Sequence, residues 1–142
     1  MSLMFEPLRK YASFTGRARR LEYWLFQLFI ALVVGALLIW IGWVLPPGPD
    51  TDAQSWFADA VASTPAARLP ATLLGLTGLF FFLPTLAVSV RRLHDSNKSG
   101  WWVLLGLTGL GSLILMILYL IDGTNGPNRF GPDPKGRAGP AG

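Results

Sequence analysis

Three long uncharged stretches constrain this chain more than any other feature. They run from Tyr23 to Pro49, from Leu69 to Val90 and from Ser99 to Ile121. Each matches or exceeds the roughly 20 residues that a helix rising ~1.5 Å per residue needs to cross a hydrocarbon core ~30 Å thick. Because unpaired backbone groups are costly in lipid, apolar runs without alternating polarity form helices there and not barrel strands. The sequence therefore predicts an all-α integral membrane protein with three transmembrane helices.

Length and composition limit the domain organisation and exclude several classes of function. The 142 residues leave room for one membrane domain, residues 1–134, with spans at about 22–45, 69–90 and 101–121. The Gly- and Pro-rich residues 135–142 are expected to be disordered. Cys is absent and His94 is the single histidine, so we expect no disulfide, no metal centre and no cofactor. Basic residues beside apolar helices also explain the positive charge without a nucleic-acid partner.

The basic residues predict the orientation in the membrane. Eight lie before the first span or between the second and third: Arg9, Lys10, Arg17, Arg19, Arg20, Arg91, Arg92 and Lys98. Four lie in the first loop or the tail: Arg68, Arg129, Lys135 and Arg137. The chain is therefore expected to be a multi-pass membrane protein whose orientation follows the positive-inside rule. Its N-terminus is expected in the cytoplasm and its C-terminus outside.

Two short helices are predicted beside the spans. Residues 5–14 have an apolar face and begin near Pro7, which favours an amphipathic helix on the membrane surface that ends before Gly16. A frayed terminus is the alternative. In the outer loop, residues 53–62 are expected to form a short interfacial helix carrying Trp56 and Phe57.

A polar cluster between the second and third spans is the sharpest local signal. If the second helix continues to Asp95, both Arg91 and Arg92 can reach that carboxylate. One guanidinium is then left for a phosphate or for Glu22. The alternative is charge that only sets topology, together with a turn. His94 with Ser96 or Ser99 could act as base and nucleophile, but the sequence shows no carboxylate to orient the imidazole and no oxyanion hole.

The pentapeptide Gly-Leu-Thr-Gly-Leu occurs twice, at residues 75–79 and 106–110. Small residues in membrane helices let neighbouring helices approach closely, so helix packing is the expected role of both copies. Membrane composition alone favours these residue types, and the repetition therefore carries little weight as an internal repeat.

Three motifs together resemble a known family. They are Gly16 to Trp24 (GRARRLEYW), Arg91 to Asp95 (RRLHD) with Ser99 to Trp102 (SGWW), and Asn128 to Pro134 (NRFGPDP). In this order they are similar to the small bacterial inner-membrane family known as domain of unknown function 805, over about residues 5–134. The resemblance implies a helical inner-membrane protein without an assigned activity. It also implies that the motifs are family features, which favours a role for the inner cluster beyond topology.

The sequence thus favours a membrane-embedded binding or interaction module with no catalytic residues. Its cytoplasmic-face cluster is expected to bind anionic lipid headgroups or a partner protein, either another membrane protein or a second copy of the chain. The candidate residues are Arg17, Arg19, Arg20, Glu22, Arg91, Arg92, His94 and Asp95. The resemblance adds an outer-face motif of Asn128, Arg129, Phe130 and Asp133. An oligomeric small transporter or channel component is the alternative, and a lipid-headgroup-modifying enzyme is a more distant one.

Overall fold

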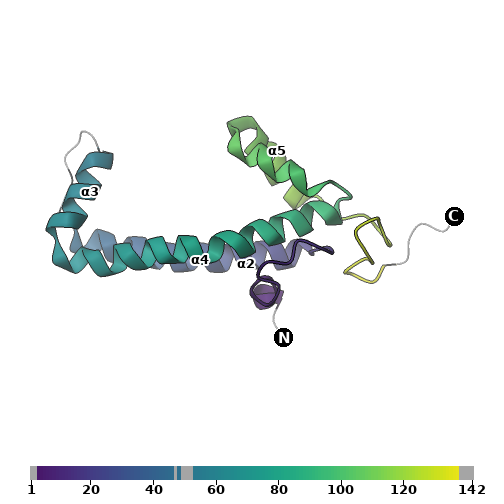
Figure 1. Cartoon of the computed structure of the whole chain (residues 1–142), viewed down its shortest axis with the longest axis horizontal. Helices are drawn as coiled ribbons and strands as arrows, with labels where there is room; N and C mark the ends of the chain where they lie inside the picture. Colours follow the sequence, from purple (N-terminus) through teal and green to yellow (C-terminus); the bar gives the residue numbers. More distant parts are fainter. Residues whose placement is uncertain (1–2, 47, 49–52, 138–142) are drawn as a thin grey trace. The chain divides into compact units, whose positions relative to one another are not determined.

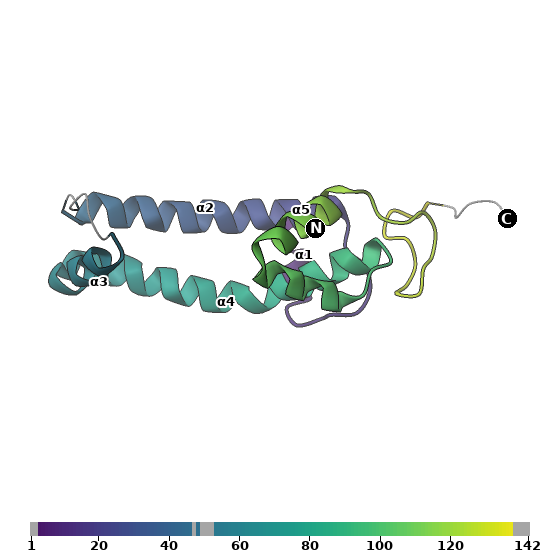
Figure 2. The same ribbon diagram turned by 90° about the horizontal axis from the view of Figure 1, so that it is seen from above.

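The computed structural model describes residues 3–46, 48 and 53–137, and these residues form helices joined by short loops. Within them the β-structure is limited to an isolated bridge between Asn128 and Gly131. Figure 1 and Figure 2 show the helices in two views. In chain order the elements are η1 (Leu3–Phe5), α1 (Glu6–Arg9), α2 (Arg20–Val44), α3 (Ala53–Ser63), α4 (Pro65–Asp95), η2 (Gly100–Leu107) and α5 (Gly109–Leu120), where η marks a 3₁₀ helix.

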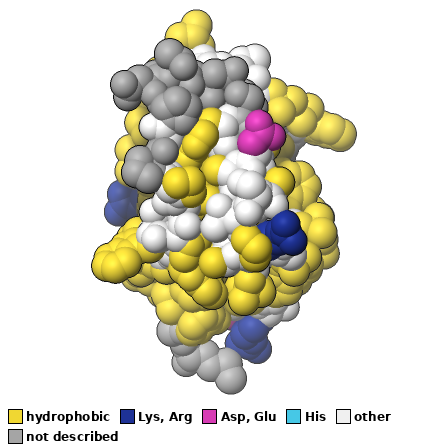
Figure 3. Space-filling view, turned by 90° about the vertical axis from the view of Figure 1, so that its left-hand side faces the viewer, with side chains coloured by type: hydrophobic (Ala, Val, Ile, Leu, Met, Phe, Trp, Pro, Cys, Tyr) yellow, Lys and Arg dark blue, Asp and Glu magenta, His cyan; other side chains and the backbone are white. Residues whose placement is uncertain are grey.

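Helices α2 and α4 correspond to the first two predicted spans. They have 25 and 31 residues, and in the described part of the chain these are the two helices long and apolar enough to cross a membrane. Both carry large apolar side chains on their outer surfaces, for example Leu32, Ile39 and Leu79, which are 64–75% exposed. Such surfaces are stable in lipid and not in water. Figure 3 faces the end of the molecule at which α3 lies and shows hydrophobic side chains among polar and backbone atoms, with few charged groups.

The third apolar stretch is not one continuous helix, contrary to the prediction for residues 101–121. It begins as the 3₁₀ helix η2, breaks at Thr108 and continues as α5, which has 12 residues. At ~1.5 Å per residue, α5 is roughly 18 Å long, well short of a hydrocarbon core of ~30 Å. The two pieces pack against each other as a hairpin. Three spanning helices are therefore not confirmed.

The chain divides into two compact units. Unit 1 contains residues 1–28 and 82–142, and unit 2 contains residues 29–81. Inside unit 2, the rings of Phe29 and Phe81 meet edge to face with centroids 5.9 Å apart. Unit 1 contains the hairpin, all the candidate site residues and both termini.

The two predicted flanking helices have different outcomes. The outer-loop helix is confirmed as α3, in which Trp56 is partly buried beside Leu38 and Ile41. The N-terminal helix is shorter than predicted, because α1 ends at Arg9 and Lys10 is its C-cap. Pro7 does lie in the first turn, where its missing N–H costs no helical hydrogen bond.

Candidate functional site

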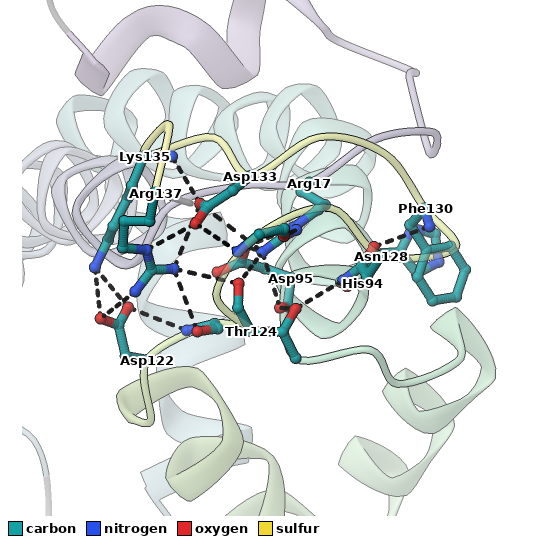
Figure 4. Close-up of polar contacts among 12 residues, drawn as sticks. Arg17, His94, Asp95, Asp122, Thr124, Asn128, Phe130, Asp133, Lys135 and Arg137 are labelled. Carbon is teal, nitrogen blue, oxygen red and sulfur yellow. Dashed lines mark hydrogen bonds and ion pairs between the residues drawn. The ribbon is translucent and has the colours of Figure 1, made fainter. Parts of the chain in front are cut away.

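A buried carboxylate, Asp95, joins two arginines from opposite ends of the sequence. Arg17 Nε donates to Asp95 Oδ1 over 2.9 Å, and Arg92 Nη1 donates to Asp95 Oδ2 over 2.6 Å. All three side chains are at most 1% exposed. Because α4 continues to Asp95, Arg92 is one turn before it, and the predicted i,i+3 pair is confirmed. We call Arg17, Arg92 and Asp95 the Asp95 site; Figure 4 shows Arg17 beside Asp95.

The remaining N–H groups of these arginines bind backbone carbonyls at and beyond the end of α5. Arg17 donates to the carbonyls of Thr124 and Gly126 over 2.6 and 2.7 Å. Arg92 donates to the carbonyls of Tyr119 and Ile121. The last carbonyls of a helix have no partner within the helix, and here buried guanidinium groups supply one. The Asp95 site thus holds the returning end of the hairpin.

The start of the hairpin lies at the same end of α4. A Cβ built on Gly100 would lie 2.7 Å from Val90 Cγ1 and 3.4 Å from His94 Nε2, so η2 begins in close contact with α4. The chain therefore leaves and returns at the same end of this helix. Thr124 completes the return, because its N–H donates to the Asp95 carbonyl over 2.9 Å. Figure 1 and Figure 2 both show the yellow C-terminal segment beside the end of α4.

A second buried pair joins Glu22 at the start of α2 to Arg91 of α4. Arg91 Nη1 donates to Glu22 Oε1 over 2.8 Å, and the two side chains are 1% and 6% exposed. The predicted reach of one α4 arginine to Glu22 is thus observed. In contrast to the Asp95 site, Arg91 Nε and Nη2 are buried without a hydrogen-bond partner among the described residues. This guanidinium keeps unused donors.

The other two candidate arginines of the N-terminal motif lie outside the buried pairs. Arg20 is about half exposed; it donates to the Leu120 carbonyl over 3.1 Å and lies 3.6 Å from Asp122. The Arg19 side chain is partly buried and has no hydrogen bond or ion pair within the described ranges. Five of the eight predicted residues thus belong to the Asp95 site or to the pair of Arg91 and Glu22, and His94 is next to Asp95 in the chain. Arg19 and Arg20 lie at the edge.

The motif expected on the outer face lies instead against the inner cluster, and this corrects the prediction. The Phe130 ring stacks on His94 with centroids 3.8 Å apart, and Asn128 Nδ2 donates to the His94 carbonyl over 2.9 Å. Arg129 donates to the Asn97 carbonyl, and Asp133 lies 3.9 Å from Arg17. The prediction assumed one straight helix over residues 101–121, whereas η2 and α5 form a hairpin and the motif that follows lies beside His94 (Figure 4).

Ion pairs hold the segment after this motif. Arg137 Nε donates to Asp133 Oδ2 over 2.7 Å, and Lys135 Nζ lies 2.6 Å from Asp122 Oδ1. The hydrogen bond from Arg137 holds the pKa of Asp133 well below its ordinary value, and the one from Lys135 lowers the pKa of Asp122. Residues 135–137 thus belong to the folded unit and not to a disordered tail. Residues 138–142 of that predicted tail lie outside the described residues.

Sequence reasoning missed the residues that receive the hairpin, chiefly Gly123 and Thr124. A Cβ on Gly123 would collide with the Asp95 carboxyl group, so only glycine lets the backbone pass there. Thr124 Oγ1 adds a second hydrogen bond to the Asp95 carbonyl. The signal that could have found them is the pair of small residues that follows Asp122, between the apolar stretch and the motif at Asn128. Groups of three or more potential metal ligands do not occur among the described residues.

Comparisons with known proteins identify relatives along almost the whole chain. A family model described as "Protein of unknown function (DUF805)" matches residues 11–132. The Escherichia coli K12 protein named "Inner membrane protein YhaH" is 37% identical over 139 residues, which cover 95% of this chain and 98% of that relative. "Inner membrane protein YhaI" from the same strain is 39% identical over 136 residues, covering 95% and 97% respectively. No solved structure matches significantly.

Proposed function

Because the chain belongs to the DUF805 family and is a small inner-membrane protein, we propose that it is a lipid-binding module whose unit 1 contacts anionic lipid at the cytoplasmic face. The observation that carries this proposal is the division of charge between the units. Unit 2 has one basic residue, Arg68, and three acidic ones, Asp50, Asp52 and Asp59. The other eleven basic and five acidic residues belong to unit 1, an excess of six positive charges.

The same division supports a topology with both termini in the cytoplasm. Arg17 and Thr124 are hydrogen-bonded, so in this fold the N-terminal motif and the segment after α5 lie on one side of any membrane that α2 and α4 cross. Two spans and a hairpin that re-enters the same face then replace the three predicted spans. All eleven basic residues of unit 1 lie at the cytoplasmic end in this arrangement, which agrees with the positive-inside rule more closely than the predicted eight against four.

Within unit 1 the buried and exposed cations have different roles. The donors of Arg17 and Arg92 are taken by Asp95 and by backbone carbonyls, so these two residues serve the fold. The three lysines of the chain are exposed residues of unit 1; Lys98 lies over the Trp102 ring, Lys10 also pairs with Glu6 over 3.1 Å, and Lys135 pairs with Asp122 over 2.6 Å. Each basic residue near an anionic membrane surface contributes about 1 kcal/mol of attraction. We assign lipid binding chiefly to these exposed cations. Arg91 is buried and retains two unused donors, Nε and Nη2, within the described residues.

The test replaces all three lysines by glutamine and compares the lipids that copurify with the protein. We expect a loss of the preference for anionic over zwitterionic lipid by up to about 100-fold, since three contributions of ~1 kcal/mol add to roughly two orders of magnitude. The matched control replaces the same lysines by arginine, which keeps the charge. Equal anionic enrichment in the glutamine variant would contradict the proposal and direct attention to a protein partner.

The topology has its own experiment, and the absence of native Cys keeps it free of background labelling. Single cysteines replace Ser13, Ser63 or Asn125 in intact cells treated with a membrane-impermeant thiol reagent. We expect Ser13→Cys and Asn125→Cys to be protected until the cells are opened, and Ser63→Cys to react at once. Rapid labelling at position 125 from outside would restore the three-span arrangement.

We also propose that unit 1 binds and does not catalyse. His94 Nδ1 lies 3.2 Å from the Gly16 carbonyl, which accepts only, so the imidazole is oriented by a carbonyl and not by a carboxylate. Among the described residues, neither Ser96 nor Ser99 hydrogen-bonds to His94. A nucleophile and base within hydrogen-bonding reach are the minimum for covalent catalysis. The geometry therefore offers less support for a lipid-modifying enzyme than for a binding module.

A further inference from the structure

A mainly apolar pocket of about 480 Å³ lies beside His94 in unit 1. Its volume is within the range of about 300–1,000 Å³ that is typical of small-molecule sites. The N-terminal segment, α4 and η2 form its walls, with Phe14, Leu86, Val90, His94, Ser99, Gly100, Trp101, Val103 and Leu104 as lining residues. We call it the His94 pocket. Most of its wall is hydrocarbon, and its polar side chains are His94 and Ser99.

The His94 side chain presents an unused acceptor. Its Nδ1 carries the proton, because the Gly16 carbonyl beside it can only accept a hydrogen bond. The other nitrogen, Nε2, therefore has a lone pair and no partner in the part of the chain that the structure describes. The stacked Phe130 ring fixes the plane of the imidazole. The imidazole is therefore held in a position to accept a hydrogen bond from a ligand at Nε2.

Ser99 supplies the complementary donor. It is the N-cap of η2, yet its hydroxyl makes no capping hydrogen bond and has no other partner within the described ranges. A ligand at this end of the pocket can thus donate to His94 and accept from Ser99. Arg129, whose guanidinium carbon lies 4.7 Å from the centroid of the Phe130 ring, adds positive charge behind the imidazole.

The polar end decides which molecule is preferred. An apolar wall gives little advantage to a ligand that comes from a bilayer, because lipid tails already surround it with hydrocarbon. The occupant must therefore gain its preference from His94 and Ser99. In an apolar pocket the neutral form of a carboxylic acid is favoured, because burial raises the pKa of the carboxyl group; this form has one oxygen that donates and another that accepts, whereas a phosphodiester stays ionised and has no proton to donate. We propose that the His94 pocket binds a long-chain fatty acid, with the carboxyl group at His94 and Ser99 and the chain along Leu86, Val90 and Leu104.

This inference deepens the proposed lipid binding and rests on it for the position of unit 1 at the membrane. The first experiment incubates the purified full-length protein, in detergent micelles, with a photoreactive diazirine fatty acid and locates the attached chain by mass spectrometry. We expect labelling between residues 86 and 104 that oleic acid suppresses and methyl oleate does not, since the ester cannot donate to Nε2. Equal competition by the ester, or labels spread evenly over α2 and α5, would overturn the proposal.

Variants then separate the pocket from the charged surface. Leu104→Trp adds bulk to the pocket wall at a side chain that is 51% exposed and should abolish the labelling, whereas Leu107→Trp, an identical change on the same helix at a residue that does not line the pocket, should not. Ser99→Ala removes one hydrogen bond and should weaken oleic acid binding about 5-fold. If labelling survives Leu104→Trp, the pocket is not the site. The lysine-to-glutamine variant keeps the pocket, so its effect on anionic lipid tests the proposed function independently.

Discussion

The two copies of Gly-Leu-Thr-Gly-Leu have identical sequences and different conformations. At residues 75–79 the pentapeptide lies inside α4 and continues the helix. At residues 106–110 it covers the end of η2, the break at Thr108 and the start of α5. Local propensity is the same in both places, so it cannot be the cause of the difference. The residues after each pentapeptide, and the tertiary contacts that they make, must therefore decide whether the helix continues.

Contacts made after the second copy explain its break. Thr108 caps α5 by accepting a hydrogen bond from the Gly111 N–H over 3.1 Å. A Cβ on Gly111 would collide with the Leu105 carbonyl, so the turn fits only with glycine there. The end of α5 then binds Arg17 and Arg92. After Leu79 the chain remains helical in α4 up to Asp95.

The largest effect on the conformation of the second copy is expected from Asp95→Asn. It leaves two buried guanidinium groups without their carboxylate, and removing one partner of a buried ion pair costs about 3–5 kcal/mol. We expect a loss of that size in the free energy of unfolding in detergent, together with protease cleavage after residue 121. Asp122→Asn is the matched control, since that carboxylate is 38% exposed and its loss should cost less than about 1 kcal/mol. Equal stability of Asp95→Asn and wild type would contradict the proposed anchor.

A smaller effect is expected from replacing a single glycine by alanine. The two sites compared are Gly111, directly after the second copy, and Gly78, within the first. Gly111→Ala should destabilise the protein by about 1–3 kcal/mol, because the new methyl group overlaps the Leu105 carbonyl. Gly78→Ala meets open space inside α4 and should be neutral or stabilise by up to about 1 kcal/mol through helix propensity. Thermal unfolding of both variants in the same detergent measures the difference. A destabilising Gly78→Ala would mean that the first copy packs as tightly as the second.

The sequence was sufficient for features that depend on hydropathy and helical spacing. Apolar length predicted α2 and α4, and the spacing of Arg92 and Asp95 predicted their ion pair. The break of residues 101–121 into η2 and α5 was not predicted, because a straight helix and a hairpin contain the same apolar residues. Hydropathy is identical for the two arrangements, and only the tertiary contacts of Arg17 and Arg92 distinguish them.

The C-terminal motif shows the same limit. Its residues were recognised as a unit, but their side of the membrane was derived by counting spans. The expectation of three straight spans separated this motif from the inner cluster, whereas Asn128 and Phe130 contact His94 and Asp133 lies near Arg17. The stacking of Phe130 on His94 involves residues 36 positions apart in the chain, and no spacing rule connects them. A second charge count, with the tail beside the N-terminal motif, favours the topology proposed above.

The smallest expected effect concerns the segment after the hairpin at acidic pH. The pKa of Asp133 is held below its ordinary value of 3.8 by the hydrogen bond from Arg137, and that of Asp122 is lowered by Lys135. A carboxylate with a lowered pKa in the folded state stabilises that state above its ordinary pKa, and the contribution is lost as the pH falls through the lowered value. Amide hydrogen exchange of residues 122–137, corrected for intrinsic rates, should be constant from pH 7 to pH 5 and should increase below about pH 4. In Asp133→Asn this dependence should become weaker, because the amide does not titrate. If the variant keeps the full dependence, Asp133 does not hold this segment, and the return of the hairpin depends on the Asp95 site alone.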